Sequence, residues 1–112
     1  MAFKGDLDAL ILGVLQHHSA HGYEIAKQIT KKTNDLMRLG EGKLYPALHK
    51  LEEAGLVTAE WQQQEGKPSR RIYKITEQGL RELDHKKSVW AQLSSGIDSI
   101  LSAARKEDRS HA

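Results

Sequence analysis

The last third of the chain carries an apolar stripe that is longer than the chain's own core can cover. Its members recur at spacings near 3.5 residues and are Leu80, Leu83, Trp90, Leu93, Ile97, Ile100, Leu101 and Ala104. This spacing predicts one amphipathic helix from Thr76 to about Ala104, which would span about 40 Å at 1.5 Å per residue. Because one domain of 112 residues cannot bury such a stripe alone, a second copy of the chain is the simplest partner. The stripe therefore predicts a homodimer.

The composition excludes several classes of protein. The absence of cysteine rules out a disulfide framework, a thiolate nucleophile and a zinc ribbon. The longest apolar run, residues 9–15, is interrupted by Gly13 and is far too short to span a bilayer. No secretory leader pattern precedes it, so we expect a cytoplasmic protein without a membrane partner. The formal net charge of +2 is too small to indicate a polyanion-binding protein by itself.

Three shorter helices are predicted before the hairpin, over residues 6–18, 23–32 and 43–54. The first has apolar residues at i, i+3, i+4, i+7 and i+8, from Leu7 to Leu15. In the third, proline is tolerated in the first turn, so regular helix should begin between Lys43 and Pro46. Gly55 predicts a left-handed C-terminal cap, with Leu56 folding back on the helix.

A basic hairpin follows the third helix. Residues 56–62 and 70–75 are β-branched and aromatic runs, and the turn-rich segment 64–69 connects them. Lys67, Arg70, Arg71 and Lys74 carry four positive charges with no acid among them between residues 66 and 76. Thr76 is a suitable N-cap for the final helix. The hairpin therefore carries a local cluster of positive charge.

Three helices and a basic hairpin, in this order, are typical of a winged helix-turn-helix, whose third helix enters the major groove while the hairpin contacts flanking phosphates. The predicted fold class is mostly α with a small β-hairpin, followed by a long C-terminal dimerisation helix. The predicted units are a DNA-binding domain (1–76), the dimerisation helix (77–104) and a flexible tail (105–112). The predicted contacts with double-stranded DNA are Tyr23, Lys27, Lys43, Tyr45, Pro46, His49, Lys50, Lys67, Ser69, Arg70 and Arg71. Glu52 and Glu53 come only at the end of the third helix, where phosphate contact is not expected.

Three segments resemble the signature segments of the PadR family of bacterial transcriptional regulators. They are HGYEI (residues 21–25), GKLYPALHKLEEAGL (residues 42–56) and RIYKITEQG (residues 71–79). The resemblance implies a winged-helix homodimer that represses transcription and releases DNA on binding a small molecule. The twofold symmetry of the predicted dimer would present two third helices to successive major grooves and so predicts a palindromic operator. The single C-terminal helix is similar to that of shorter, multidrug-sensing members. Lys43 stands where the family usually has a threonine or another small residue, which leaves the base preference open.

The resemblance also implies an effector site. In the drug-sensing relatives, a tryptophan at the place of Trp90 faces its symmetry mate and stacks planar ligands. Trp90, with Leu10, Val14, Leu93 and Ile97, is therefore predicted to line a pocket for a small aromatic or phenolic effector. From the residues alone, Trp90 equally suits the core of a dimer interface. The predicted interface comprises Leu7, Leu83, Trp90, Leu93, Ile97, Ile100 and Leu101.

Several alternatives stay open. A winged helix can serve as a protein-binding module, with the wing contacting an acidic partner in place of DNA. Tyr45 and His49 can edge the core, and Tyr23 can pack between helices. His17 and His21 are four residues apart, as in helical metal sites, but residues 19–22 interrupt that helix, so we predict neither metal nor cofactor. The chain has no glycine-rich phosphate loop, nucleophile elbow or suggestive carboxylate pair, so we do not expect an enzyme.

Overall fold

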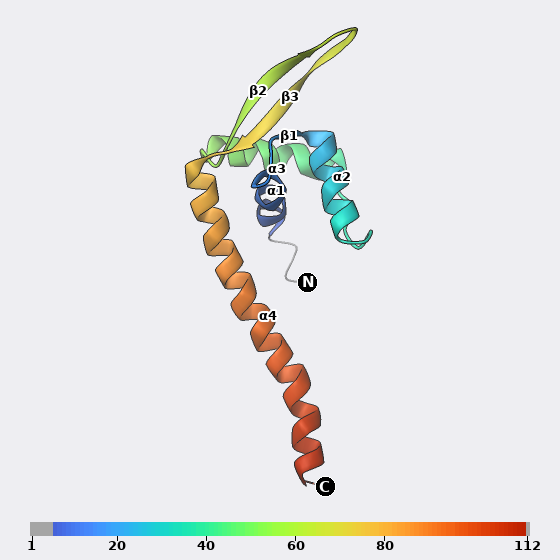
Figure 1. Cartoon of the computed structure of the whole chain (residues 1–112), viewed down its shortest axis with the longest axis vertical. Coiled ribbons are helices and arrows are strands. Elements are labelled where there is room, and N and C mark those ends of the chain that lie inside the picture. The colour runs from blue at the N-terminus through green and yellow to red at the C-terminus, as the bar shows by residue number, and fades with distance from the viewer. Residues whose placement is uncertain (1–5, 112) are drawn as a thin grey trace.

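The computed structural model describes the backbone of residues 6–111 and the side chains of residues 6–102. Its elements are α1 (Leu7–Leu15), β1 (Ala20–His21), α2 (Gly22–Lys32), α3 (Glu41–Glu53), β2 (Val57–Gln64), β3 (Lys67–Ile75) and α4 (Glu77–His111). The first three helices form a compact unit with the sheet base, by which we mean β1 and the paired ends of β2 and β3 nearest to it. The rest of the β2–β3 hairpin, which is the wing, and α4 project from this unit in opposite directions (Figure 1). This arrangement separates the wing from the free end of α4 along a molecule 71 Å long.

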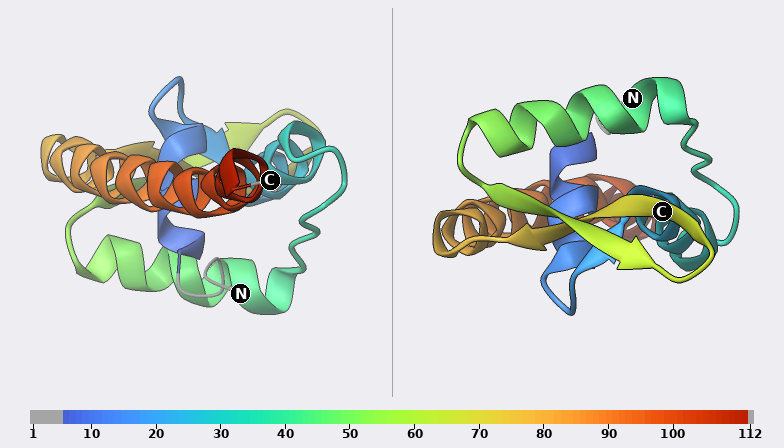
Figure 2. Two further views of the ribbon diagram at one scale, coloured as in Figure 1. Left: turned by 90° about the horizontal axis from the view of Figure 1, so that it is seen from below. Right: turned by 90° about the horizontal axis from the view of Figure 1, so that it is seen from above.

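The hydrophobic core lies where α1 meets the other helices. α1 packs against α2, α3 and α4, and it crosses the middle of the molecule when viewed along the long axis (Figure 2). Buried apolar residues come from every helix and from the sheet base, and they are Ile11, Leu12, Leu15, Ala20, Ile25, Ile29, Leu44, Leu48, Leu51, Val57, Tyr73 and Leu83. The predicted apolar stripes of the first and third helices therefore face the core, as expected from their spacing.

α3 ends as predicted and begins earlier than predicted. Gly55 has φ of +78°, and the N–H groups of Gly55 and Leu56 donate to the carbonyls of Glu52 and Leu51, each at 3.0 Å. This is the Schellman arrangement. The start at Glu41 corrects the predicted boundary of 43–46, because Pro46 lies one turn inside the helix rather than in its first turn.

The sheet has a third strand that was not predicted from the sequence. β1 pairs antiparallel with β3, with Ala20 opposite Tyr73 and His21 opposite Ile72, giving the strand order β1-β3-β2. A strand of two residues has no periodicity to detect. The wing is also longer than predicted, because the strands continue to a two-residue turn that contains Gly66 at φ +71°.

A tight joint connects α3, the wing and α4. The Thr76 N–H donates to the Leu56 carbonyl at 3.0 Å, and the Thr76 hydroxyl donates to the Gly55 carbonyl at 2.7 Å. The Gly79 N–H in turn donates to Thr76 Oγ1 at 3.0 Å, which confirms Thr76 as the N-cap of α4. A Cβ atom at residue 79 would collide with the Leu56 carbonyl, so only glycine permits this close approach.

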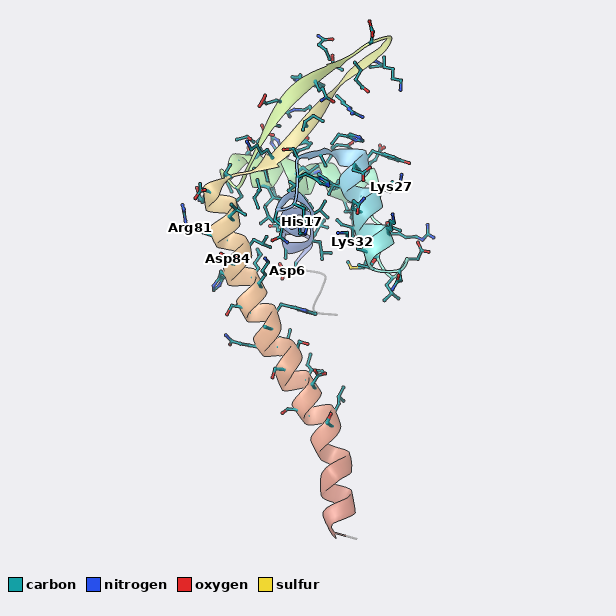
Figure 3. All side chains as sticks on the ribbon, viewed as in Figure 1. Asp6, His17, Lys27, Lys32, Arg81 and Asp84 are labelled. Atoms are coloured by element: carbon teal, nitrogen blue, oxygen red, sulfur yellow. The ribbon has the colours of Figure 1, made fainter. Side chains whose placement is uncertain are left out.

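The first turns of α4 are held against α1. Lys86 Nζ lies 3.2 Å from the Asp6 carboxylate, and Lys87 Nζ donates to Gln16 Oε1 at 2.8 Å. Figure 3 shows Asp6 beside the upper part of α4. Beyond these contacts α4 leaves the compact unit and continues through residues 105–111, for which the sequence predicts a flexible tail. Ala112 lies outside the described residues.

No helix in the described part of the chain is long and apolar enough to cross a membrane.

Candidate nucleic-acid interface

A concave surface lies between the start of α2, the outer face of α3 and the wing. Its hollow has a volume of about 590 Å³, and we refer to it as the interface hollow. Six of the residues predicted to contact DNA line it, namely Tyr23, Tyr45, His49, Ser69, Arg70 and Arg71. His21, Gly22, Glu52, Trp61 and Tyr73 complete the lining, and none of these was predicted to belong to the interface.

Tyr45 reaches from α3 onto the first residue of α2. The position of a Cβ atom at residue 22 would lie 2.7 Å from the Tyr45 hydroxyl oxygen and within 2.9 Å of two of its ring carbons. Only a glycine at this position lets the ring settle against α2. Tyr45 is nevertheless 42% exposed, so one side of it packs on the helix while the rest faces the hollow.

Tyr23 lies at the rim of the interface hollow. Its side chain is 68% exposed, and its ring stacks on that of His21 with centroids 6.2 Å apart. His21 is the N-cap of α2, because its Nδ1 accepts a hydrogen bond from the Glu24 N–H at 3.4 Å. The phenol of Tyr23 is thus accessible at a helix N-terminus, where backbone N–H groups and the helix dipole favour an anion.

A second concave region of about 760 Å³ adjoins the first along α2. It is lined by the predicted contact residue Lys27 and by Lys31 and Arg38, which were not among the predicted contacts. Arg38 pairs with the exposed Asp35 at 3.4 Å, which reduces its effect on the local charge. Lys27 lies toward the wing end of α2, whereas Lys32 lies toward the opposite end (Figure 3). Lys27 and Lys31 extend the basic surface beyond the interface hollow.

Two acidic residues at the end of α3 are paired with predicted DNA contacts. Glu52 Oε2 lies 3.0 Å from Arg71 Nη2, and Glu53 Oε2 lies 3.4 Å from His49 Nε2. From the sequence we expect these acids to stay clear of the interface because they come late in α3. Glu52 reaches it because α3 passes beneath the wing, which no local pattern reveals, whereas Glu53 pairs with His49 one turn away on the same helix. The positive charge of Arg71 is consequently balanced within the chain.

The remaining predicted contacts are exposed but stand outside the hollow. Lys43, Pro46 and Lys50 lie on the solvent-facing side of α3, and Lys67 lies directly after the wing turn. Within the wing, Arg70 Nε donates to Gln62 Oε1 at 3.0 Å and the Ser69 hydroxyl donates to Gln63 Oε1 at 3.4 Å. These hydrogen bonds across the strands orient polar side chains near the tip.

The residues predicted to bind the effector are divided between two separate cavities and the exposed face of α4. Trp90 and Leu10 line an apolar cavity of about 210 Å³ between α1 and α4, together with Leu83 and Lys86. Val14 lines a different hollow of about 200 Å³ between α1 and α2. The other two residues, Leu93 and Ile97, lie farther along α4 and are exposed. Among the described residues of one protomer, Leu10 thus lies beside Trp90 in the first cavity and beside Val14 in the second, and the three do not share one pocket.

The residues predicted to form the dimer interface also fall into two groups, one buried and one exposed. Leu83 is only 3% exposed because it packs into the core of its own protomer, so it is not available to a partner as predicted. Leu7 is half-buried beside the same core. The exposed members form one stretch of α4 and are Trp90, Leu93, Ile97, Ile100 and Leu101.

The histidines do not assemble a metal site in the described part of the chain, where no group of three potential ligands is found. His17 lies after the end of α1, while His21 lies in β1 and caps α2. The two histidines are therefore not on one helix, because residues 16–21 turn between the elements.

Comparison with known proteins identifies the class that this arrangement defines. Three helices, a small antiparallel sheet and a projecting wing form a winged helix. A transcriptional regulator from Clostridium thermocellum superposes with a TM-score of 0.79 at 30% identity, covering 88% of this chain and 95% of that one. Bacillus subtilis PadR, solved in complex with operator DNA, superposes with a TM-score of 0.66 at 28% identity, covering 71% of this chain and 45% of that one.

The sequence comparisons identify the family. The Transcriptional regulator PadR-like family matches residues 11–85. The transcriptional regulator YqjI of Escherichia coli is 34% identical over 80 residues, which are 71% of this chain and 37% of that protein. The chain belongs to the PadR-like family of transcriptional regulators, as its signature segments predict.

The cap on α2 makes the stability of the protein sensitive to pH. Burial, and secondarily the Arg70 guanidinium, lowers the pKa of His21 below its ordinary value of 6.5, against the raising effect of Glu24. A histidine whose pKa is depressed by folding stabilises the native state fully above pH 6.5 and loses this contribution as the pH falls below it. Protonation would also remove the Nδ1 lone pair that accepts the Glu24 N–H.

We therefore expect the urea midpoint of the wild-type protein to fall more between pH 7.5 and pH 5.5 than that of His21→Asn. Asparagine is also a good N-cap but does not titrate in this range. His85→Gln, which removes an exposed histidine on α4, serves as the control and should behave as the wild type does. An equal loss of stability in the wild type and His21→Asn would contradict this role of His21.

Proposed function

We propose that the protein is a DNA-binding transcriptional repressor that binds a palindromic operator as a homodimer and acts in the cytoplasm. The observation that carries the proposal is the interface hollow, where Tyr23, Tyr45 and Arg70 converge from α2, α3 and the wing. The solved complex of Bacillus subtilis PadR with operator DNA supports the same use of this fold. In this arrangement α3 enters the major groove and the wing follows the flanking backbone.

The charges of the surface assign different roles to the predicted contacts. Lys27, Lys43, Lys50 and Lys67 are exposed, and no acidic residue is paired with them in the described part of the chain. They are suited to neutralise phosphates. Tyr45 projects from α3 into the hollow, where its hydroxyl can donate a hydrogen bond to a base edge or phosphate. Affinity on this view comes from several separate lysines rather than from one cationic cluster.

Selection from a random pool of duplex DNA tests the proposed function. We expect enrichment of an inverted repeat with half-sites about one helical turn apart, near 34 Å. Binding to it should weaken steeply with salt. We call the magnitude of the decrease of log K with log[salt] the salt slope, and Lys67→Ala should lower it by about 0.9, because one phosphate is no longer neutralised. Glu65→Gln, at the wing turn, is the matched control and should not lower the slope. Failure to enrich any inverted repeat would favour the winged-helix protein-binding module.

The exposed stretch of α4 supports the homodimer. Ile100 and Leu101 are 72% and 67% exposed in the protomer, and Trp90, Leu93 and Ile97 precede them at helical spacing. Contiguous apolar surface of this kind marks an association site. Pairing of two α4 helices would cover it and would hold two α3 helices in the symmetric arrangement that a palindrome requires.

Charge placed in this stretch should therefore separate the protomers. We expect Ile97→Lys to sediment as a monomer at concentrations where the wild type sediments as a dimer, because an unpaired charge would be buried in the interface. Gln92→Lys places the same charge on α4 beside the stretch and should leave the dimer intact. A dimer that persists in Ile97→Lys would assign the interface to another surface.

We further propose that a small planar aromatic or phenolic molecule releases the protein from DNA by binding at Trp90. The apolar cavity of about 210 Å³ formed by Trp90, Leu10 and Leu83 supports this proposal. In the proposed dimer the exposed Leu93 and Ile97 would lie near the same place on the paired helices. A ligand seated between α1 and α4 would change their packing and thereby the separation of the two α3 helices.

Fluorescence of Trp90 in a Trp61→Phe background provides the test. A panel of planar aromatic cations and phenolic acids should include compounds that quench it saturably, and the same compounds should weaken operator binding. Trp90→Ala, used at concentrations where it still sediments as a dimer, should bind the operator and lose the response to these compounds. Compounds that still bind Trp90→Ala in equilibrium dialysis would end the assignment of this site.

A further inference from the structure

The wing carries a large aromatic side chain that none of the contacts above uses. Trp61 lies in β2 directly opposite Arg71 of β3, and it is 69% exposed. It lines the interface hollow on the side opposite Tyr45 and His49 of α3. Tryptophan is enriched at interfaces because it combines a large apolar ring with a polar N–H group. The position of Trp61 places an indole beside the proposed path of the DNA backbone.

Arg71 holds this indole in place. The guanidinium carbon lies 5.6 Å from the centre of the Trp61 ring and 5.8 Å from that of the buried Tyr73. Its Nη2 atom forms the 3.0 Å ion pair with Glu52 of α3. Its Nε atom is buried and has no hydrogen-bond partner among the described residues. One side chain thus connects α3, the sheet base and the exposed ring of the wing.

We propose that Trp61 contacts the DNA backbone and that Arg71 is a positioning residue rather than a phosphate ligand. This inference rests on the proposed function and adds a contact to it. The indole offers its apolar surface to a deoxyribose, next to the phosphates that Lys67 and Arg70 approach. If Arg71 turned toward a phosphate, it would break its ion pair and leave the Glu52 carboxylate unpaired beside the DNA. The Arg71–Glu52 ion pair therefore sets the distance between the wing and α3.

The two roles of Arg71 are separated by two variants. A phosphate ligand would be replaced adequately by lysine, and its removal in the double variant Arg71→Met, Glu52→Gln, which deletes both charges of the pair, would lower the salt slope by about 0.9. A positioning residue needs the planar guanidinium, which lysine lacks. We expect Arg71→Lys to bind the selected operator about threefold to fivefold more weakly than the wild type. We also expect the double variant to be weakened with an unchanged salt slope.

The contact by Trp61 is tested on the same operator. Trp61→Ala should bind about tenfold more weakly with an unchanged salt slope, because the substitution removes apolar surface from the interface and leaves its charge unaltered. Thr58→Ala, on the opposite face of the same strand, should bind as the wild type does. In a Trp90→Phe background, the operator should shift the emission of Trp61 and protect it from acrylamide quenching. This fluorescence measurement requires no alteration of the wing.

The outcomes distinguish this inference from the function on which it rests. If the wild type binds no duplex DNA, both are overturned. If the wild type binds and Trp61→Ala binds equally well, or if Trp61 stays open to acrylamide in the complex, the contact by Trp61 is overturned alone. Full affinity of Arg71→Lys, or a lower salt slope of the double variant Arg71→Met, Glu52→Gln, would make Arg71 a phosphate ligand.

Discussion

The geometry of the molecule depends on the hydrogen-bonded joint formed by Gly55, Leu56, Thr76 and Gly79. Thr76 alone donates to two carbonyls of the α3 cap and accepts from the first turn of α4. The end of α3, the base of the wing and the start of α4 are thereby fixed by one small set of short contacts. Gly55 supplies the left-handed backbone and Gly79 the close approach. The wing and α4 leave this joint in opposite directions (Figure 1), so the proposed DNA surface and association surface do not compete for space.

The balance of charge at the interface hollow is more even than the linear sequence suggests. The wing is cationic as a string of residues, yet Arg71 is paired with Glu52 and His49 with Glu53. The Arg71–Glu52 pair connects the wing with α3, and the His49–Glu53 pair lies within α3, whereas exposed lysines on α2, α3 and the wing are suited to neutralise phosphates. A surface of this kind orients its side chains through rigid internal contacts, and it attracts phosphates through dispersed exposed charges.

The helices and their ends were largely predictable because their signals are local. Thr76 caps α4 through its side-chain hydroxyl and Gly55 caps α3 through its left-handed backbone, each within a few residues, and the stripes of α1 and α3 face the core as their spacing requires. Pro46 was a weaker guide, because a proline is tolerated one turn inside a helix whose first residues carry no apolar signal. β1 was missed for a different reason, since its two residues are strand only because β3 lies beside them.

The sequence by itself determined the order of elements, the family signature and the presence of an apolar stripe in need of a partner. Only the tertiary structure decided how those residues are used. Leu83 belongs to the stripe but is buried within its own protomer, Gly22 makes room for the Tyr45 ring, and Arg71 faces Glu52 from 19 residues away along the chain. The physical reason is that caps and amphipathic stripes act within a few residues. Burial, close approach and charge pairing depend on which elements the fold brings together.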